Sequence, residues 1–229
     1  MTLNAWFIHA KNEKPLGTII HFHGNAENIS THFYGSLFLA EKNFDVLIFD
    51  YRGYGLSTGK PSQQGLITDS IAIFQWLQKN ARNQNFFIFA QSLGGAVAIP
   101  SYVLSPTKLN MKAIVLDSTF SSYRGIARNK LSLSFLTWPL QGPLGFLVSD
   151  DASAIHFIDK IHIPILFVHS KIDPVVPYQF GYELYKKAHQ PKEFWEISTA
   201  GHTVAFAQKD SQYRKKLYQY FISFLGPKK

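Results

Sequence analysis

The sequence predicts an α/β fold, in which helices cover both faces of a mostly parallel central sheet of about seven or eight strands. Short apolar runs alternate with longer stretches of helical character along most of the chain. The runs are almost continuously apolar, which is typical of strands buried on both faces. With 229 residues, 46% of them hydrophobic, the chain is long enough for one sizeable core, and we expect a single domain over 1–229.

Seven apolar runs are the expected strands: Leu3–His9, Thr18–Phe22, Val46–Phe49, Phe86–Phe89, Ala113–Leu116, Ile165–His169 and Glu193–Ile197. Five helices are expected between and after them: Ile29–Glu41, Gly65–Asn80, Gly94–Val103, Tyr178–Ala188 and a last one from about Asp210 to Phe224. Apolar residues recur at helical spacing in the second helix and predict a stripe that faces the core: Leu66, Ile67, Ile71, Phe74 and Leu77.

One long segment, residues 121–160, interrupts this alternation. Long connections inside compact domains are usually functional. The segment is rich in apolar residues, namely Leu131, Leu133, Phe135, Leu136, Trp138, Pro139, Leu140, Leu144, Phe146 and Leu147. We interpret it as a small lid or cap of short helices over the carboxyl ends of the strands. A packed excursion that buries its own apolar residues is the alternative.

The most informative motif is Phe-Ala-Gln-Ser-Leu-Gly-Gly at residues 89–95, between an expected strand and an expected helix. Such a turn holds a serine on a strained backbone and lifts its hydroxyl clear of the sheet. The backbone N–H of Leu93 would then lie beside a carbonyl that approaches Ser92. The usual pattern is Gly-x-Ser-x-Gly, and here Ala90 replaces the first glycine. A small-residue turn without chemistry is the alternative interpretation.

Ligand sites in parallel sheets lie outside the carboxyl ends of the strands, and further polar loops are expected there. Asn25 follows Gly24 after the second strand, and its backbone N–H is a candidate oxyanion donor. Asp173 follows the sixth strand in a loop stiffened by prolines, and His202 follows the seventh on a glycine-hinged loop. The loop at residues 50–55, punctuated by glycines, is expected to form a rigid wall of the site.

Ser92, Asp173 and His202 occur in the chain order of serine hydrolases with the α/β-hydrolase fold. The chain resembles this family from the second of its usual eight strands to its last helix. Its His-Gly-Asn-Ala-Glu-Asn, Asp-Tyr-Arg-Gly-Tyr-Gly-x-Ser and Gly-Lys-Pro-Ser-Gln-Gln-Gly segments are most similar to a subgroup of small single-domain acyl hydrolases. That subgroup includes protein depalmitoylases. The resemblance implies an oxyanion hole made by the backbone N–H groups of Leu93 and Asn25.

The expected activity is metal-independent hydrolysis of carboxylic esters or thioesters through an acyl-enzyme intermediate. Ser92 is the expected nucleophile, because its hydroxyl can be activated by His202 as general base. Asp173 is expected to fix the tautomer of the histidine. Acyl transfer to an acceptor other than water, a peptidase-type activity and a non-catalytic binding module stay open as alternatives. Epoxide and dehalogenase chemistry are disfavoured, because they need a carboxylate nucleophile at the elbow.

Several other polar residues are alternative candidates for roles in the site. Asp117 also follows a strand and is an alternative acid. His169, at the end of its strand, is interpreted as a packed or hydrogen-bonded core histidine. His21 and His23 lie on one face of an extended strand, but no further ligand spacing supports a metal. We expect neither a metal nor another cofactor, and we interpret His23 as a brace of the oxyanion loop.

The formal charge of +8 and a pI near 9.5 favour contact with anionic surfaces. The basic residues are scattered, so a solvated basic surface and a membrane-facing patch are both open interpretations. No nucleic-acid motif accompanies them, and we expect no nucleic-acid partner. The expected partner is a small-molecule or lipid-like acyl ester or thioester. The sequence predicts no particular oligomeric state.

Cysteine is absent, which excludes disulfides and thiolate chemistry. No apolar run approaches the about 18 residues of a membrane span, and the N-terminus lacks the form of a signal peptide. Strand-like sequence nevertheless begins at Leu3, as if the chain started inside a domain. A longer natural protein, secreted or membrane-anchored, is therefore an open alternative, and the compartment is not predicted.

Overall fold

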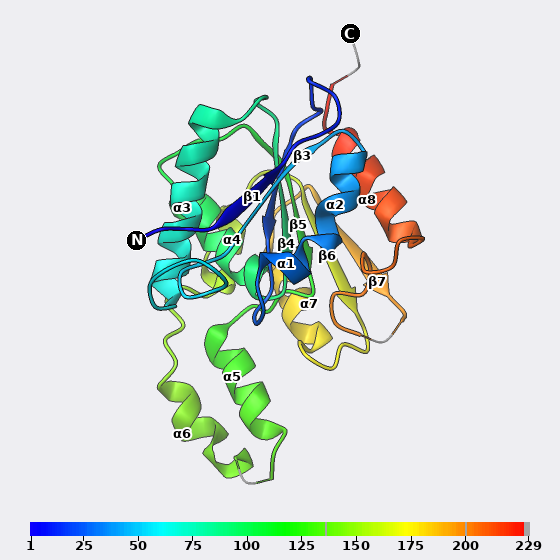
Figure 1. The fold of residues 1–229 in the computed structure, drawn as a ribbon. Coiled ribbons are helices and arrows are strands. Elements are labelled where there is room, and N and C mark those ends of the chain that lie inside the picture. The colour runs from blue at the N-terminus through cyan, green and yellow to red at the C-terminus, as the bar shows by residue number, and fades with distance from the viewer. Residues whose placement is uncertain (136, 200, 227–229) are drawn as a thin grey trace.

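The computed structural model describes residues 1–135, 137–199 and 201–226, and it contains a seven-stranded sheet (Figure 1). The strand order is β1-β3-β2-β4-β5-β6-β7, with β1 antiparallel to β3 and the other pairs parallel. The strands are Ala5–Ile8 (β1), Thr18–Phe22 (β2), Asp45–Phe49 (β3), Phe86–Gln91 (β4), Met111–Asp117 (β5), Ile165–Ser170 (β6) and Lys192–Ile197 (β7). The predicted mostly parallel sheet is confirmed.

The helices lie in two layers, with α2 and α8 on one face of the sheet and α3 and α4 on the other (Figure 1). The α-helices are Ile29–His32 (α1), Tyr34–Glu41 (α2), Gln63–Asn80 (α3), Leu93–Leu104 (α4), Tyr123–Ser132 (α5), Gln141–Phe146 (α6), Tyr178–Lys187 (α7) and Gln212–Ile222 (α8). Short 3-10 turns are Trp138–Leu140 (η1), Ala154–His156 (η2) and Ile158–Lys160 (η3).

Two hydrophobic cores fill the space between sheet and helices, and the strand residues alternate between them. In β4, Phe86 and Ile88 pack in the core with α3 and α4. Phe87 and Phe89 pack in the core with α2 and α8. All four side chains are fully buried. Because both faces of the strand are covered, its sequence is continuously apolar, which is the pattern that the sequence analysis used.

Every predicted strand and four of the five predicted helices are found, with ends within two residues of the expected ones. The helix expected over Ile29–Glu41 is divided instead into α1 and α2 at Phe33. The carbonyl of Phe33 accepts hydrogen bonds from the backbone N–H of Ser36 and of Leu37, at 3.0 and 2.9 Å. The hydrogen-bond ladder therefore restarts at this residue, which sequence periodicity does not reveal.

The segment that interrupts the α/β alternation forms a helical hairpin, α5 with η1 and α6, whose helices pack against each other. Figure 1 shows the hairpin projecting away from the sheet at the end where β5 finishes. The alternative that this segment buries its own apolar residues is wrong, because most of them are exposed: Leu133, Phe135, Trp138, Leu140, Leu144, Phe146 and Leu147. Leu136 lies outside the described residues.

Asp150 anchors both ends of the hairpin to each other. Its Oδ1 accepts hydrogen bonds from the Ser122 hydroxyl at 2.8 Å and from the Arg124 backbone N–H at 3.0 Å. Ser153 also donates to this carboxylate. Partial burial opposes ionisation, but the hydrogen bonds from Ser153, Arg124 and Ser122 outweigh it and lower the pKa of Asp150. The ionised carboxylate therefore closes the base of the hairpin.

The start of α4 lies directly against the end of β2, and this approach requires a glycine at position 94. A Cβ atom on Gly94 would lie 2.1 Å from the carbonyl oxygen of Phe22 and 2.7 Å from that of His23. Both obstacles are backbone atoms, which cannot move aside as a side chain can. Any side chain at this position would therefore push the helix off the sheet.

We predict that Gly94→Ala lowers the free energy of unfolding by about 1–3 kcal/mol, the usual cost of an overpacked site. Urea denaturation would measure the change. Gly142→Ala is a matched control, since a Cβ atom there meets no atom within 4 Å. The control should be neutral or slightly stabilising, because alanine favours helix over glycine by up to about 1 kcal/mol. Equal stability of Gly94→Ala and the wild type would contradict the close approach.

Candidate active site

Ser92 occupies the turn between β4 and α4 with a backbone that few L-residues adopt. Its φ and ψ are 53° and −117°. Such a conformation typically costs about 1–3 kcal/mol and persists only where surrounding contacts enforce it. One of these contacts is the hydrogen bond from the Ser92 backbone N–H to the Asp117 carbonyl at the end of β5, 2.8 Å long. The strained serine turn predicted from the sequence is present.

The backbone N–H groups of Leu93 and Asn25 are unpaired within the described part of the chain. Leu93 is the first residue of α4, where helix N–H groups have no partner inside the helix. Gly24 brings the second loop close, because a Cβ atom on it would lie only 3.6 Å from the Ser92 Cβ. Two backbone donors are therefore available in the two loops beside the serine.

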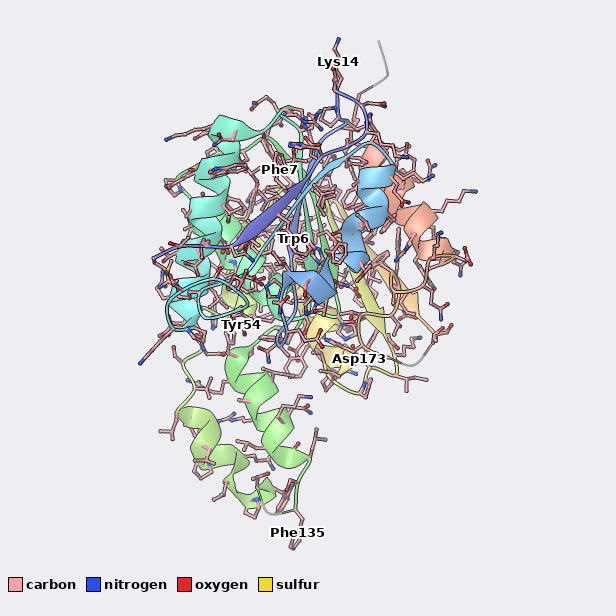
Figure 2. All side chains as sticks on the ribbon, viewed as in Figure 1. Trp6, Phe7, Lys14, Tyr54, Phe135 and Asp173 are labelled. Atoms are coloured by element: carbon pink, nitrogen blue, oxygen red, sulfur yellow. The ribbon has the colours of Figure 1, made fainter. Side chains whose placement is uncertain are left out.

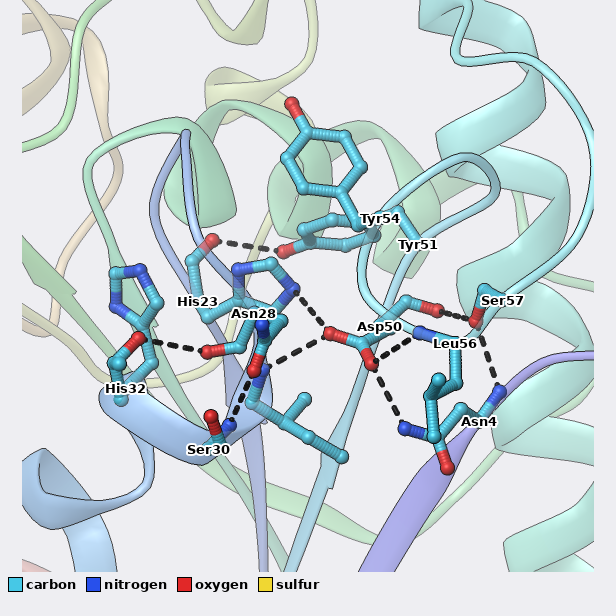
Figure 3. A network of polar contacts seen from close by, with 12 residues as sticks. Asn4, His23, Asn28, Ser30, His32, Asp50, Tyr51, Tyr54, Leu56 and Ser57 are labelled. Atoms are coloured by element: carbon cyan, nitrogen blue, oxygen red, sulfur yellow. Dashed lines mark hydrogen bonds and ion pairs between the residues drawn. The ribbon is translucent and has the colours of Figure 1, made fainter.

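Asp50 is the buried carboxylate that holds the loop of Asn25 in place (Figure 3). One of its oxygens accepts a hydrogen bond from the Ile29 backbone N–H at 2.9 Å, and the other from the Asn4 side chain at 2.8 Å. The Ser57 hydroxyl donates to the Asp50 carbonyl at 2.7 Å. One residue thus joins the segment before β1, the loop after β2 and the loop after β3.

The loop after β2 is itself strained. Ala26 and Glu27 both adopt positive φ, at 66° and 53°. Two tyrosines of the loop after β3 brace it, since the Tyr54 hydroxyl donates to Asn25 Oδ1 at 2.6 Å and the Tyr51 hydroxyl donates to the His23 carbonyl at 3.1 Å. Tyr54 also lines the pocket beside Ser92, so the glycine-punctuated loop forms part of the wall, as expected.

His23 braces the same loop as a neutral side chain. Its Nδ1 lies 2.8 Å from the Gly24 carbonyl, so this nitrogen must be the donor. Burial lowers the pKa of His23 to about 4, although that hydrogen bond favours the charged form. The sequence interpretation of His23 as a brace is confirmed.

Asp173 and His202 form a hydrogen-bonded pair. His202 Nδ1 lies 2.8 Å from Asp173 Oδ2, and Asp173 Oδ1 accepts from the backbone N–H groups of Val175 and Val176 at 2.8 and 2.9 Å. Burial opposes ionisation of Asp173, but the His202 hydrogen bond and the two backbone donors outweigh it and lower its pKa. The carboxylate accepts a hydrogen bond from the Nδ1–H of His202, and in this tautomer Nε2 carries a free lone pair.

The His202 loop and the Ser92 turn both rest on the carboxyl end of β5. Thr203 N donates to the Ser118 hydroxyl at 3.2 Å, and Ser118 follows Asp117, whose carbonyl holds Ser92. No hydrogen bond joins the Ser92 hydroxyl to the His202 ring among the described residues. The structure thus pairs Asp173 with His202 and brings Ser92 to the same strand end, without closing the contact between serine and histidine.

Asp117, the alternative acid, belongs to a buried polar chain that begins next to Ser92, at Gln91. Its Oδ2 accepts from Gln91 Nε2 at 3.0 Å, Gln91 Oε1 lies 3.2 Å from His21 Nε2, and His21 Nδ1 lies 2.8 Å from the Ser36 hydroxyl. Burial raises the pKa of Asp117 to about 7. No hydrogen bond links its carboxyl group to His202 in the part of the chain that the structure describes. The geometry therefore favours Asp173 as the partner of the histidine.

The remaining histidines are engaged in structural contacts. His169 is buried, and its Nε2 lies 2.9 Å from the Val176 carbonyl, so the interpretation as a hydrogen-bonded core histidine is confirmed. His21 and His23 each use Nδ1 for a different neighbour. Over residues 1–135, 137–199 and 201–226, no three His, Asp or Glu side chains are grouped so that they could hold a metal ion.

A pocket of about 480 Å³ opens beside the serine, within the usual range for small-molecule sites. Its floor contains Asn25, Ser92 and Leu93. Its walls are mostly apolar. They come from the loop after β3 and the start of α3, from the β5–α5 region with α5, from Val148 after α6, and from the loop after β6. Lys130, on α5, is the charged residue among the lining side chains that the structure describes, and the sequence analysis did not anticipate its position.

Comparison with known proteins agrees with this geometry. Residues 13–141 match the family model described as serine aminopeptidase, S33. The chain belongs to the α/β-hydrolase-fold serine hydrolases. The YfhR protein of Escherichia coli strain K12 is 34% identical over 232 residues, which cover 98% of this hydrolase and 78% of YfhR.

Two further matches extend the family. The lysophosphatidylserine lipase ABHD12 of Danio rerio is 32% identical over 209 residues, 86% of this hydrolase and 53% of ABHD12. Among solved structures, the esterase Pf2001 of Pyrococcus furiosus superposes with a TM-score of 0.73 at 18% identity, and the match covers 98% of this chain and 92% of that one. At 18% identity, the structural match shows a shared fold.

The raised pKa of Asp117 predicts a pH-dependent stability. Between the ordinary value near 3.8 and about 7, the folded hydrolase keeps a proton that the unfolded chain has lost, so stability falls as the pH rises through this window. The fall is about 1.4 kcal/mol per pH unit. Asparagine does not titrate, so Asp117→Asn removes this fall in stability. The variant should therefore gain stability relative to the wild type between about pH 4 and about pH 7. Urea denaturation at several pH values would measure this, and a constant difference would contradict it.

Proposed function

We propose that this chain is a metal-independent serine hydrolase that cleaves carboxylic esters or thioesters through an acyl-enzyme intermediate. The observation that carries the proposal is the strained turn that holds Ser92 on the floor of an apolar pocket, between the unpaired backbone N–H groups of Leu93 and Asn25. The hydrogen-bonded pair of Asp173 and His202 supports it, because a serine hydroxyl needs a base whose tautomer is fixed.

In the proposed reaction, His202 Nε2 takes the hydroxyl proton while Ser92 Oγ bonds to the carbonyl carbon of the substrate. The carbonyl electron pair moves onto oxygen, where the N–H groups of Leu93 and Asn25 stabilise the negative charge. The tetrahedral intermediate collapses, and His202 returns the proton to the departing alcohol or thiol. Water then attacks the acyl-serine by the same steps, which releases the acid and restores the serine.

The pocket supports an acyl substrate with little charge on its acyl chain. Its lining is mostly apolar, and Lys130 is the charged side chain among the described lining residues. The relatives named as an esterase and a lysophosphatidylserine lipase support the same substrate class. A small ester or a lipid-like acyl ester is therefore the proposed substrate, and a thioester is its closest chemical variant.

A peptidase-type activity is the second candidate, because the family model is described as a serine aminopeptidase. An aminopeptidase must bind a free, cationic amino terminus, which calls for a carboxylate in the pocket. None of the described lining residues is Asp or Glu, and Lys130 would repel such a group. The pocket chemistry therefore favours esters. Acyl transfer would use the same residues, and product analysis with an added alcohol separates transfer from hydrolysis.

The first test is hydrolysis of p-nitrophenyl esters across a series of acyl chain lengths. Ser92→Ala should lower the rate by about 10⁴-fold or more, because the nucleophile of a catalytic triad is lost. Ser223→Ala, beyond the end of α8, serves as the control and should keep the wild-type rate. The preferred chain length reports the length of the acyl pocket. Retained turnover in Ser92→Ala would refute the proposed nucleophile.

A second test separates the two candidate acids. Asp173→Asn should lower kcat by about 10⁴-fold, because the histidine would no longer be held in the active tautomer. Asp117→Asn should keep most of the activity, since its carboxyl group bonds to Gln91 and not to His202. The two isosteric variants can be compared in the same ester assay. A larger loss of activity in Asp117→Asn than in Asp173→Asn would make Asp117, not Asp173, the acid that supports His202.

A further inference from the structure

The α5–α6 hairpin carries an unusual concentration of exposed apolar side chains. Of the sixteen exposed large apolar residues in the described chain, seven lie between residues 133 and 147: Leu133, Phe135, Trp138, Leu140, Leu144, Phe146 and Leu147. We call these seven the hairpin face. Phe135 is 92% exposed and lies at the end of the hairpin farthest from the sheet (Figure 2). Apolar surface gathered in this way marks an interaction site.

The packing inside the hairpin does not bury these side chains in an apolar core. The Arg128 guanidinium lies 4.5 Å from the centre of the Phe146 ring, and that of Arg124 lies 5.7 Å from it. Gly145 admits the Arg128 stem, because a Cβ atom there would lie 2.4 Å from Arg128 Cγ. Arginine side chains thus fill much of the contact between α5 and α6. No residue of α5 is fully buried, so the hairpin has little apolar core of its own.

The positive charge of the same segment favours an anionic partner. Residues 121–149 contain three basic residues, Arg124, Arg128 and Lys130, and no acidic residue. Asp150, at the base, is engaged by Ser122 and the Arg124 backbone. Aromatic and aliphatic side chains beside arginine and lysine are typical of segments that lie in the interface of an anionic bilayer. A second copy of this chain would bring the same positive charges against them.

We propose that the α5–α6 hairpin docks this protein onto an anionic lipid bilayer surface. The hairpin face enters the boundary between headgroups and acyl chains, and Arg124, Arg128 and Lys130 lie at the level of the lipid phosphates. Within the described residues, no helix combines the length and the apolar character needed to cross a bilayer. The hairpin therefore binds at the surface of the membrane.

The docking surface is continuous with the pocket. Tyr123, Ile126, Ala127 and Lys130 line the pocket from α5, the helix that leads to the hairpin face. A docked hairpin therefore connects the lipid surface to the pocket through α5. The docking inference goes beyond the proposed hydrolase activity and does not require it, so binding is tested in Ser92→Ala, where turnover cannot alter the lipids.

The test is flotation of Ser92→Ala with vesicles of phosphatidylcholine alone or of equal parts phosphatidylcholine and phosphatidylglycerol. We expect binding to the anionic vesicles that weakens with added salt, and far less binding to phosphatidylcholine. Phe135→Ser in this background should weaken binding roughly tenfold, because one large exposed side chain no longer leaves water. Leu104→Ser is the matched control, since Leu104 is an exposed apolar residue at the far end of α4.

Charge is tested separately. Lys130→Glu should weaken binding by about fivefold or more, because it replaces a positive charge by a negative one near an anionic surface. Lys79→Glu, at the end of α3, makes the same change on an exposed residue far from the hairpin and should bind as the parent does. Trp138 gives a second readout: its fluorescence should shift to the blue with anionic vesicles, and the shift should be absent in Trp138→Phe.

Three outcomes would overturn the docking proposal. The first is the failure of Ser92→Ala to float with anionic vesicles. The second is an equal loss of binding in Phe135→Ser and Leu104→Ser, which would assign binding to general hydrophobicity. The third is a dimer in sedimentation analysis that Phe135→Ser dissociates, which would assign the hairpin face to a second copy. None of these outcomes bears on ester hydrolysis, which is measured with soluble esters in the wild type.

Discussion

The contact between the start of α4 and the end of β2 is the constraint on which the active site depends. Only a residue without a side chain allows the helix to approach the carbonyl groups of Phe22 and His23 as closely as Gly94 does. This approach places Ser92 next to the loop of Asn25, so a backbone donor from each of two distant segments can face one carbonyl oxygen. The strain at Ser92 is held by contacts with β5, which belong to the rigid centre of the sheet.

Buried polar groups connect the loops around this centre. Asp50 joins three segments, and a second chain of hydrogen bonds runs from Asp117 through Gln91, the neighbour of Ser92, to His21. Each member of these networks has a partner, as buried polar groups require. The two buried carboxyl groups near the site differ in environment: Asp173 accepts three hydrogen bonds and has a lowered pKa, whereas Asp117 is dominated by burial and has a raised one. The two carboxyl groups are therefore held in opposite charge-favouring environments.

The hairpin differs from the rest of the chain in how it is stabilised. Its base is closed by the Asp150 carboxylate, whereas its outer part has little core and a positively charged, apolar surface. One helix of the hairpin, α5, also lines the pocket, so the hairpin face and the pocket are connected through this helix. The location of the pocket and the chemistry of this surface are therefore linked through α5.

The order of strands and helices could be predicted from the sequence. Strands of a sheet covered on both faces are continuously apolar, and helices that face a core repeat apolar residues at helical spacing. The positions of Ser92, Asp173 and His202 after strands also follow from sequence, since parallel strands end at one edge. The break at Phe33, the Gln91–Asp117 pairing and the outward-facing hairpin residues depend on contacts between segments distant in the chain. Periodicity describes one segment at a time, so only the folded chain could decide which carboxylate meets His202 and which apolar residues stay exposed.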